Sequence, residues 1–409
     1  MKKTVSVLLI GILILSCLTL VVSAHSDSEN GDWNQKSVVL KNTSEADLVV
    51  RVGDIDACND GNALSEGEYN PFTAKSQYSH GYPWAKDDSD PAGTDRIFVG
   101  SKWSGESNDG YSSNYAEYKS GNDKENAYGD GPLTLVMEYD VSDITVKNVI
   151  LQLCIDDFQA VSMESNFTVT LNGKDAPFIA ELLNHTDQTG PTAYIVSAII
   201  PSGFFDAVSS GKLTVVIDET TGIGDGYAVD FAKLLINYND KVFTGKFSGT
   251  TEPGATVRLL GTSTTVTASS TGGFSFNAIP GINAVRASKS GFVENYDSGI
   301  VLSSGTEWEA NVPLEEGKGN PDIDFSKFGV TSGEENNGNS SANSGGNGTD
   351  NPYDDGNPSG VGSNCPICHF CPQPLGLCIF IWLLIILVVI IIVVVIIAAF
   401  KKKKKKEKN

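Results

Sequence analysis

Histidine and methionine are scarce in this chain, with four and three residues among 409. His80 and His185 are the two histidines in the parts expected to fold, which leaves little for a histidine-based metal site or nucleophile. The motifs His-Glu-x-x-His and Gly-x-Ser-x-Gly and the phosphate loop are absent as well. We therefore expect a protein that is not an enzyme, with an unidentified carboxylate pair as the remaining route to catalysis.

Positive charge is also in short supply. The chain has 29 Lys and Arg against 50 Asp and Glu, a net charge of −21. When the two lysines of residues 1–3, and the seven lysines and Glu407 of the C-terminal end, are set aside, 20 basic and 49 acidic residues remain, a net of −29. This balance predicts no nucleic-acid partner and favours solubility and cation binding, with a plain acidic, solvated surface as the alternative.

Both ends of the chain have the patterns of segments that direct a protein to a membrane or anchor it there. Lys2 and Lys3, an apolar run to residue 22 and the small residues before His25 predict a signal peptide over 1–24, with a lipoprotein signal at Cys17 as the alternative. Residues 375–400 carry no charge, and as a helix they would rise about 39 Å, enough to cross a hydrocarbon core of about 30 Å. The polylysine tail 401–409 follows, which predicts a single-pass protein of the cell membrane with an outside N-terminal ectodomain and a cytoplasmic C-terminus.

The ectodomain between these ends is expected to be mainly β. Residues 25–37 look loose, and strands are predicted at 46–52, 133–139, 146–155, 167–171, 192–200, 212–217 and 227–238, with short helical turns at 178–183 and 204–208. Asn172-Gly173 predicts a hairpin turn. This spacing predicts one β-sandwich or jelly roll over 38–240, or two β-modules divided near Asp140.

A second module is predicted over 241–314. Pro253-Gly254-Ala255, Gly273-Phe-Ser-Phe276 and Gly291-Phe292 occur there in order, and residues 242–314 resemble the carboxypeptidase regulatory-like (transthyretin-like) module. The resemblance implies a small seven-stranded sandwich that acts as a spacer or adhesive unit and has no catalytic residues. Its usual acidic residue before the central turn is Ser or Thr here. Residues 38–240 are similar to uncharacterised exported β-domains and, more loosely, to carbohydrate-binding jelly rolls, through Val50–Asp56, Asp156–Gln159 and Gly224–Phe231.

The rest of the ectodomain is predicted to be a stalk. Residues 315–364 are rich in Gly, Asn, Ser and acidic side chains and have few apolar ones, which predicts disorder. The juxtamembrane segment 365–374 holds Cys365, Cys368, His369 and Cys371, a pattern that also occurs in haem attachment and zinc sites. The crowded prolines and tight spacing disfavour haem and zinc. Disulfides within one stalk, or between two stalks that they clamp into a homodimer, are the preferred interpretation. In the folded part, Cys58 and Cys154 are expected to form one disulfide, with two buried thiols as the alternative.

The acidic residues give a candidate calcium site. Calcium takes several oxygen ligands on a sharply turning backbone, and the run from Asp54 to Gly61 offers both. The predicted ligands are Asp54, Asp56, Asn59, Asp60, Asp225 and Asp230, and Asp87, Asp88, Asp90 and Asp95 form a further cluster. Solvated, turn-forming aspartates are the alternative.

Aromatic residues are dense in the same region. Flat amphipathic rings stack on sugars and on proteins, so Trp84, Trp103, Tyr82 and Tyr111 are the candidate ligand face, unless these rings pin loops to the sandwich. Glycan sequons begin at Asn42, Asn166, Asn184, Asn339 and Asn347. Together these features predict a cell-surface binding or adhesion protein for an extracellular glycan or surface protein, with calcium organising its loops. A structural envelope protein without a discrete ligand is the alternative, and a polysaccharide-acting enzyme is third.

Overall fold

The computed structural model describes residues 26–55, 70–72, 78–79, 89–100, 128–188, 192–224 and 226–330. In these ranges the chain is mainly β, as the sequence predicts. The predicted signal peptide, the cysteine motif and the apolar segment 375–400 lie outside them. Within the described ranges no helix has the length and apolarity needed to cross a bilayer.

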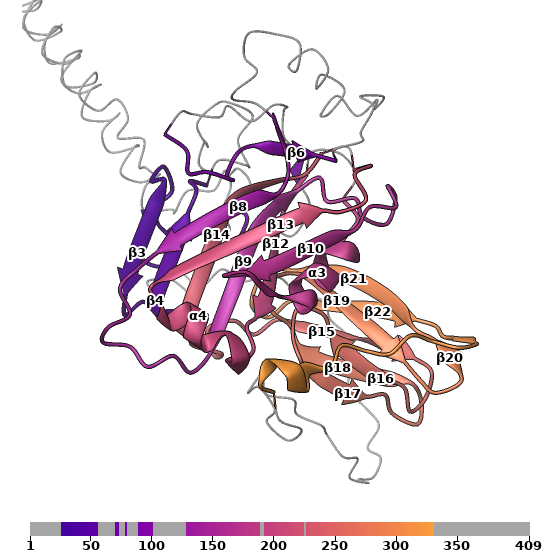
Figure 1. Cartoon of the computed structure of the whole chain (residues 1–409). Coiled ribbons are helices and arrows are strands. Elements are labelled where there is room, and N and C mark those ends of the chain that lie inside the picture. The colour runs from indigo at the N-terminus through magenta and orange to yellow at the C-terminus, as the bar shows by residue number, and fades with distance from the viewer. Residues whose placement is uncertain are drawn as a thin grey trace, which may run out of the picture. The chain divides into compact units, whose positions relative to one another are not determined.

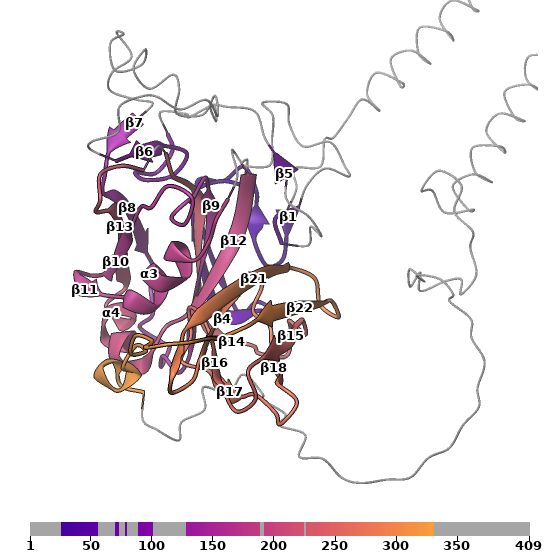
Figure 2. The same cartoon turned by 90° about the vertical axis from the view of Figure 1, so that its right-hand side faces the viewer.

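Two sheets pack face to face in the first part of the chain (Figure 2). Each strand pair within them is antiparallel. The large sheet runs in the order β3 (Ser37–Lys41), β4 (Ala46–Val52), β14 (Ala228–Tyr238), β9 (Val149–Asp156) and β12 (Thr192–Ile199). The smaller sheet runs in the order β11 (Lys174–Asp175), β10 (Phe167–Leu171), β13 (Lys212–Glu219) and β8 (Leu133–Glu138).

Side-chain alternation explains why these segments form strands. Successive residues of a strand point to opposite faces, and β13 alternates buried and partly exposed positions along its length. Leu135, Val215, Leu151 and Leu234 meet in the core between the two sheets. In β9 all eight residues are buried because both faces of the large sheet are covered.

Short helices close the edge of this core. The sequence correctly predicts α3 (Pro177–Asn184) and α4 (Phe205–Ser209). The short helix η1 (Ser202–Phe204) comes directly before α4. The predicted hairpin turn joins β10 to β11, with Asn172 and Gly173 at positive φ.

The second group of strands (Figure 1, orange) also forms two sheets. One holds β18 (Gly273–Asn277), β15 (Lys246–Thr251) and β22 (Glu307–Val312), and the other holds β17 (Thr265–Thr267), β16 (Thr256–Leu259), β19 (Gly281–Ser288) and β21 (Asn295–Val301). Phe274 and Phe276 are buried on either side of exposed Ser275, as their alternation predicts.

The two groups of strands are fused, which the sequence did not suggest. β12 pairs with β19 in parallel at Val196 and Ile282, so the large sheet continues into the small module as ten strands. The hydroxyl of Ser197 donates a hydrogen bond to Pro280 O at 2.6 Å. Apolar residues of both parts, such as Ile150 and Phe247, share one core cluster. The small module is therefore continuous with the large domain.

Residues 315–330 form a strap, although the sequence predicts that the stalk begins at 315. β23 (Glu315–Glu316) pairs with β20 (Phe292–Val293), and η2 (Phe325–Phe328) follows. The ring centroid of Phe328 lies 5.8 Å from that of Phe204 and 6.3 Å from that of Phe178. Phe325 and Phe328 anchor the strap through apolar contacts. They were missed because the prediction of disorder used the average composition of 315–364.

The N-terminal segment is also ordered where the sequence predicts a loose chain. β1 (Ser26–Asp27) pairs with β2 (Gly31–Asp32), and Trp33 is buried. The fully buried guanidinium of Arg51 holds this segment, since it donates hydrogen bonds to the carbonyl groups of Asn30, Asp32 and Gln35. Three short strands remain: β5 (Tyr78–Ser79), β6 (Ile97–Val99) and β7 (Tyr128–Asp130).

Candidate functional site

Three buried aspartates converge beside the end of β4. Asp54, Asp90 and Asp95 each offer one carboxylate oxygen, and these three oxygens lie within 4.8 Å of one another. The exposed fractions of the three residues are 7%, 6% and 5%. The sequence assigns Asp54 to one cluster and Asp90 and Asp95 to another, and the fold brings the two clusters together.

The backbone around Asp54 leaves little space. Gly53 has φ +91°, and a Cβ atom there would lie 2.3 Å from the carbonyl oxygen of Asp230. This close approach and the positive φ both favour glycine. Asp54 thus follows β4 after one glycine, and that glycine packs against β14.

The loop that carries Asp90 and Asp95 is fixed from two sides. The amide of Asp95 donates a hydrogen bond to Val229 O at 2.9 Å, which ties the loop to β14. Arg96 Nη1 donates to Pro91 O at 2.7 Å and to Thr94 O at 3.1 Å. These bonds hold both carboxylates in a preformed arrangement.

Lys36 brings a positive charge into contact with two of these carboxylates. Its Nζ lies 2.7 Å from Asp54 Oδ2 and also contacts Asp90. Burial alone would lower the pKa of Lys36, but hydrogen bonds and charge from Asp54 and Asp90 raise it above its ordinary range. One ammonium against three carboxylates leaves a formal charge of −2. Oδ1 of Asp54 accepts no hydrogen bond from the residues that the structure describes.

This arrangement suits a hard divalent cation. Calcium binds six to eight oxygens at about 2.3–2.6 Å, so three converging carboxylate oxygens would supply part of such a shell. The formal charge of −2 matches one such ion. An all-oxygen donor set favours calcium, magnesium or manganese over zinc.

Along the chain, the triad lies close to ranges that hold the predicted aromatic residues. Asp54 lies two residues before the range 56–69, and Asp90 lies two residues after 80–88. β6 and β7 pair in parallel on either side of 101–127. A cation held by the triad would therefore join the chain before residue 56 to the chain after residue 88.

Other predicted ligands of the cation are only partly placed. Asp230 is fully buried in β14, and its carbonyl group faces Gly53. Asp56, Asn59, Asp60 and Asp225, and Asp87 and Asp88 of the second cluster, lie outside the described residues.

The predicted ligand face, comprising Trp84, Trp103, Tyr82 and Tyr111, also lies outside the described residues. Cys154 is fully buried on β9, whereas Cys58 and the motif Cys365, Cys368, His369 and Cys371 are not described. The predicted disulfide between Cys58 and Cys154 therefore stays a prediction.

Three of the five sequons can be placed. Asn42 and Asn166 are exposed. The Asn184 side chain instead donates to Phe167 O at 2.9 Å and accepts from Phe167 N at 2.7 Å. A glycan on Asn184 would replace one of the two hydrogens on the nitrogen that donates this bond. Asn339 and Asn347 lie outside the described residues.

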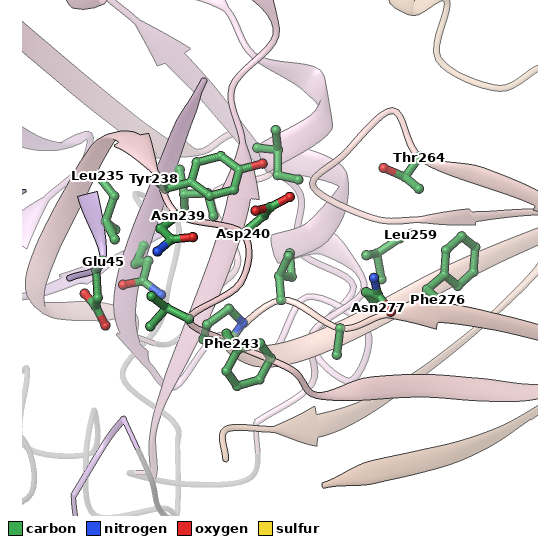
Figure 3. A pocket seen from close by; sticks show the side chains of 17 residues that line it. Glu45, Leu235, Tyr238, Asn239, Asp240, Phe243, Leu259, Thr264, Phe276 and Asn277 are labelled. Carbon is green, nitrogen blue, oxygen red and sulfur yellow. The ribbon is translucent and has the colours of Figure 1, made fainter. Parts of the chain in front are cut away.

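An apolar pocket of about 110 Å³ lies where the small module meets the large sheet (Figure 3). Leu235 and Ile150 line it from the large sheet, and Leu259 and Phe276 line it from the small module. Glu45 lies at the Leu235 end of the pocket, away from Phe276. No sequence pattern predicts this pocket, because its two walls belong to segments that the sequence divides into separate modules.

Sequence reasoning also missed the buried basic residues. Lys233 and Arg51 each interrupt a strand of otherwise mostly apolar residues, and both are fully buried. A basic residue in such a run indicates a buried polar contact, and that signal was present in both strands.

Comparison with known proteins adds little to this description. No protein-family model and no curated protein matches the chain. Among solved structures, the chain is similar to the Bacillus anthracis TIE protein, with 10% sequence identity and a TM-score of 0.16. The likeness spans 46% of this chain and 38% of that one, and a TM-score this low carries no argument about fold or function.

Proposed function

We propose that this chain is a membrane-anchored cell-surface binding or adhesion protein, whose binding loops are organised by calcium. The observation that carries the proposal is the convergence of Asp54, which comes before residue 56, with Asp90 and Asp95, which come after residue 88. The ligand is an extracellular glycan or a surface protein, since tyrosine and tryptophan rings suit both.

Calcium acts in this proposal as a clamp for the loops. It binds the triad beside Lys36, neutralises the remaining formal charge and joins the chain before residue 56 to the chain after residue 88. Fixing the ends of a long loop lowers the entropy that the loop loses when it binds a ligand. Ligand affinity then depends on calcium although the ligand contacts the aromatic rings.

The remaining parts present this face outside the cell. We propose that 242–314 is a transthyretin-like module, supported by its seven main strands in two sheets among the described residues. The segments beyond 330 supply a stalk, a cysteine-linked dimer contact and a single transmembrane helix with a cytoplasmic lysine tail.

A structural envelope protein is the second candidate. The continuous ten-stranded sheet and the strap favour it, because they join the two modules into one body that suits a load-bearing coat. This role needs no discrete ligand.

Binding of the full chain in detergent to envelope polysaccharides and intact cells tests the proposal. Saturable binding is expected with calcium, with at least tenfold weaker binding in chelator. Trp84→Ala and Trp103→Ala are expected to lose binding with unchanged melting temperature, whereas Trp308→Ala, at an exposed position on β22, is expected to retain it. Equal or absent binding with calcium and with chelator would contradict the proposal and favour the structural role.

A further inference from the structure

A second cluster of polar side chains is buried around Lys233 on β14. The side chain of Lys233 is 1% exposed, and Asn30 is 4% exposed. Lys233 Nζ donates a hydrogen bond to Asn30 Oδ1 at 2.7 Å and lies 2.5 Å from Glu45 Oε2. An amine, a side-chain amide and a carboxylate thus meet in a site from which water is largely excluded.

The surroundings of this cluster are well defined. Lys233 pairs in register with Arg51 on β4 and with Gln152 on β9, so the three side chains form a polar row across one face of the sheet. Lys233 Nζ lies 5.0 Å from the centroid of the Phe72 ring. Apolar clusters lie on both sides of the row, and they hold the amine in a medium of low polarity.

Arg51 fixes Asn30 above the lysine. Its Nε and Nη2 each donate to the backbone carbonyl of Asn30 at 3.3 Å, and Nη2 also donates to Asp32 O at 2.8 Å. Gly31 packs against Val38, where a Cβ atom would lie 2.8 Å from Cγ1. The amide group is therefore held in one place by its backbone, as a reaction between two side chains requires.

We propose that Lys233 and Asn30 become joined by an intramolecular isopeptide bond, with Glu45 transferring the protons. The Lys233 amine attacks the side-chain amide carbon of Asn30, because Lys233 Nζ already contacts the oxygen of that amide. The group that leaves is the side-chain nitrogen of Asn30. Nothing beyond the three side chains takes part.

The atoms and charges of this reaction balance. Glu45 accepts a proton from the Lys233 ammonium, and the neutral Nζ forms a bond to Cγ of Asn30. The bond between Cγ and Nδ2 then breaks as Glu45 returns a proton to Nδ2. Of the three protons on the ammonium, one stays on the new amide and two leave with Nδ2 as an ammonium ion. Glu45 ends as the carboxylate that it was at the start, and no oxidant or reductant is needed.

The leaving group has a route out of the site. The Glu45 side chain is 26% exposed and lines the pocket in Figure 3, so this side of the cluster is open. Escape of ammonia makes the reaction effectively irreversible. The bond would join positions 203 residues apart and clamp the N-terminal segment to β14.

Peptide mapping of the full chain tests the proposal. Trypsin cleaves after Lys36 and, if its side chain is free, after Lys233. The expected product is a branched peptide that joins the N-terminal peptide ending at Lys36 to residues 213–241, lighter by one ammonia than the sum of the two. Neither part contains a glycan sequon, so glycosylation does not obscure the result.

Two outcomes would overturn the proposal. One is complete cleavage after Lys233 with both peptides linear, which would make the cluster an ordinary ion pair. The other is loss of ammonia without a branch, which would indicate a backbone succinimide at Asn30-Gly31.

Variants test the role of Glu45. Glu45→Gln keeps both reacting groups and is expected to yield less than a tenth of the branched peptide. Glu45→Asp is expected to restore part of it. Glu138→Gln, a matched change at an exposed glutamate paired with Lys212, is expected to leave the yield unchanged. If Glu45→Gln is folded by circular dichroism and still forms the branch in full, Glu45 has no part in the reaction. The wild-type chain decides whether the bond exists even if every variant unfolds.

Discussion

Replacing Arg258 with methionine is expected to lower the free energy of unfolding by about 3 kcal/mol. The Arg258 side chain is 2% exposed, and its Nη2 lies 2.6 Å from both Asp322 Oδ1 and Glu181 Oε2. Methionine fills similar space but leaves both carboxylates without their main partner. Because Asp322 is 30% exposed and keeps Arg286 Nη1 at 3.5 Å, we expect the lower end of the range for a broken buried pair. Urea unfolding of the purified chain in detergent measures the change.

Lys246→Met is the matched control for Arg258→Met. Lys246 Nζ lies 2.7 Å from Glu307 Oε1, but both side chains are about half exposed, so its loss should cost less than about 1 kcal/mol. If the two substitutions lowered the free energy of unfolding equally, the buried contacts of Arg258 with Asp322 and Glu181 would not be a main source of stability.

Acidic pH should reduce the contribution of Arg258 to the free energy of unfolding. Burial alone would raise the pKa of Asp322, but hydrogen bonds and charge from Arg258, with charge from Arg286, lower it below its ordinary value of 3.8. A lowered folded-state pKa stabilises the fold fully above the unfolded value, and this contribution is lost as the pH falls through the lowered pKa. The difference between wild type and Arg258→Met should therefore shrink below about pH 4.

Gly281→Ala is the second substitution with a large expected effect. Gly281 has φ +110°, and a Cβ atom there would lie 2.0 Å from the carbonyl oxygen of Ile195 on β12. Neither backbone can move without separating β19 from β12. Strain and overpacking together should cost about 3 kcal/mol or more. Calorimetry should then show a separate, earlier transition for the small module.

Gly291→Ala separates the effect of the close approach from that of backbone strain. Gly291 has φ +86°, but a Cβ atom there would meet nothing within 4 Å. Its replacement should therefore cost only about 1 kcal/mol and leave one transition. If Gly281→Ala were as mild as Gly291→Ala, the sheet would not be continuous across the two modules in solution.

The strands were predictable because their pattern is local. The 46–52, 167–171 and 227–238 segments carry the β-rich, alternating or apolar residues that strands require, and the predicted bounds agree closely with β4, β10 and β14. The hairpin at Asn172-Gly173 was predictable for the same reason, since a two-residue turn needs positive φ at adjacent positions.

The fusion of the modules was not predictable from such patterns. The strand pairing that joins the two sheets is a single parallel contact, Val196 with Ile282, and neither strand carries a signal for its partner. The strap was missed because Phe325 and Phe328 are few among many polar residues. Composition describes the average of a segment, whereas anchoring depends on single side chains.

The candidate sites were predictable to different degrees. Acidic clusters at 54–60 and 87–95 were visible in the sequence, but their union through Asp54, Asp90 and Asp95 depends on the tertiary fold. Asn30, Glu45 and Lys233 are far apart in the sequence, and only the packing of the N-terminal segment over β14 brings them together.

Calcium titration of the full chain by calorimetry tests the central claim most directly. We predict saturable binding to the wild-type chain, with binding at least tenfold weaker in Asp95→Asn. Asparagine is nearly isosteric with aspartate and tolerates the φ of +54° at this position. Asp140→Asn, at an exposed aspartate paired with Lys41, should bind calcium as the wild type does. No binding to the wild-type chain, or equal binding to Asp95→Asn, would contradict a calcium site at the triad.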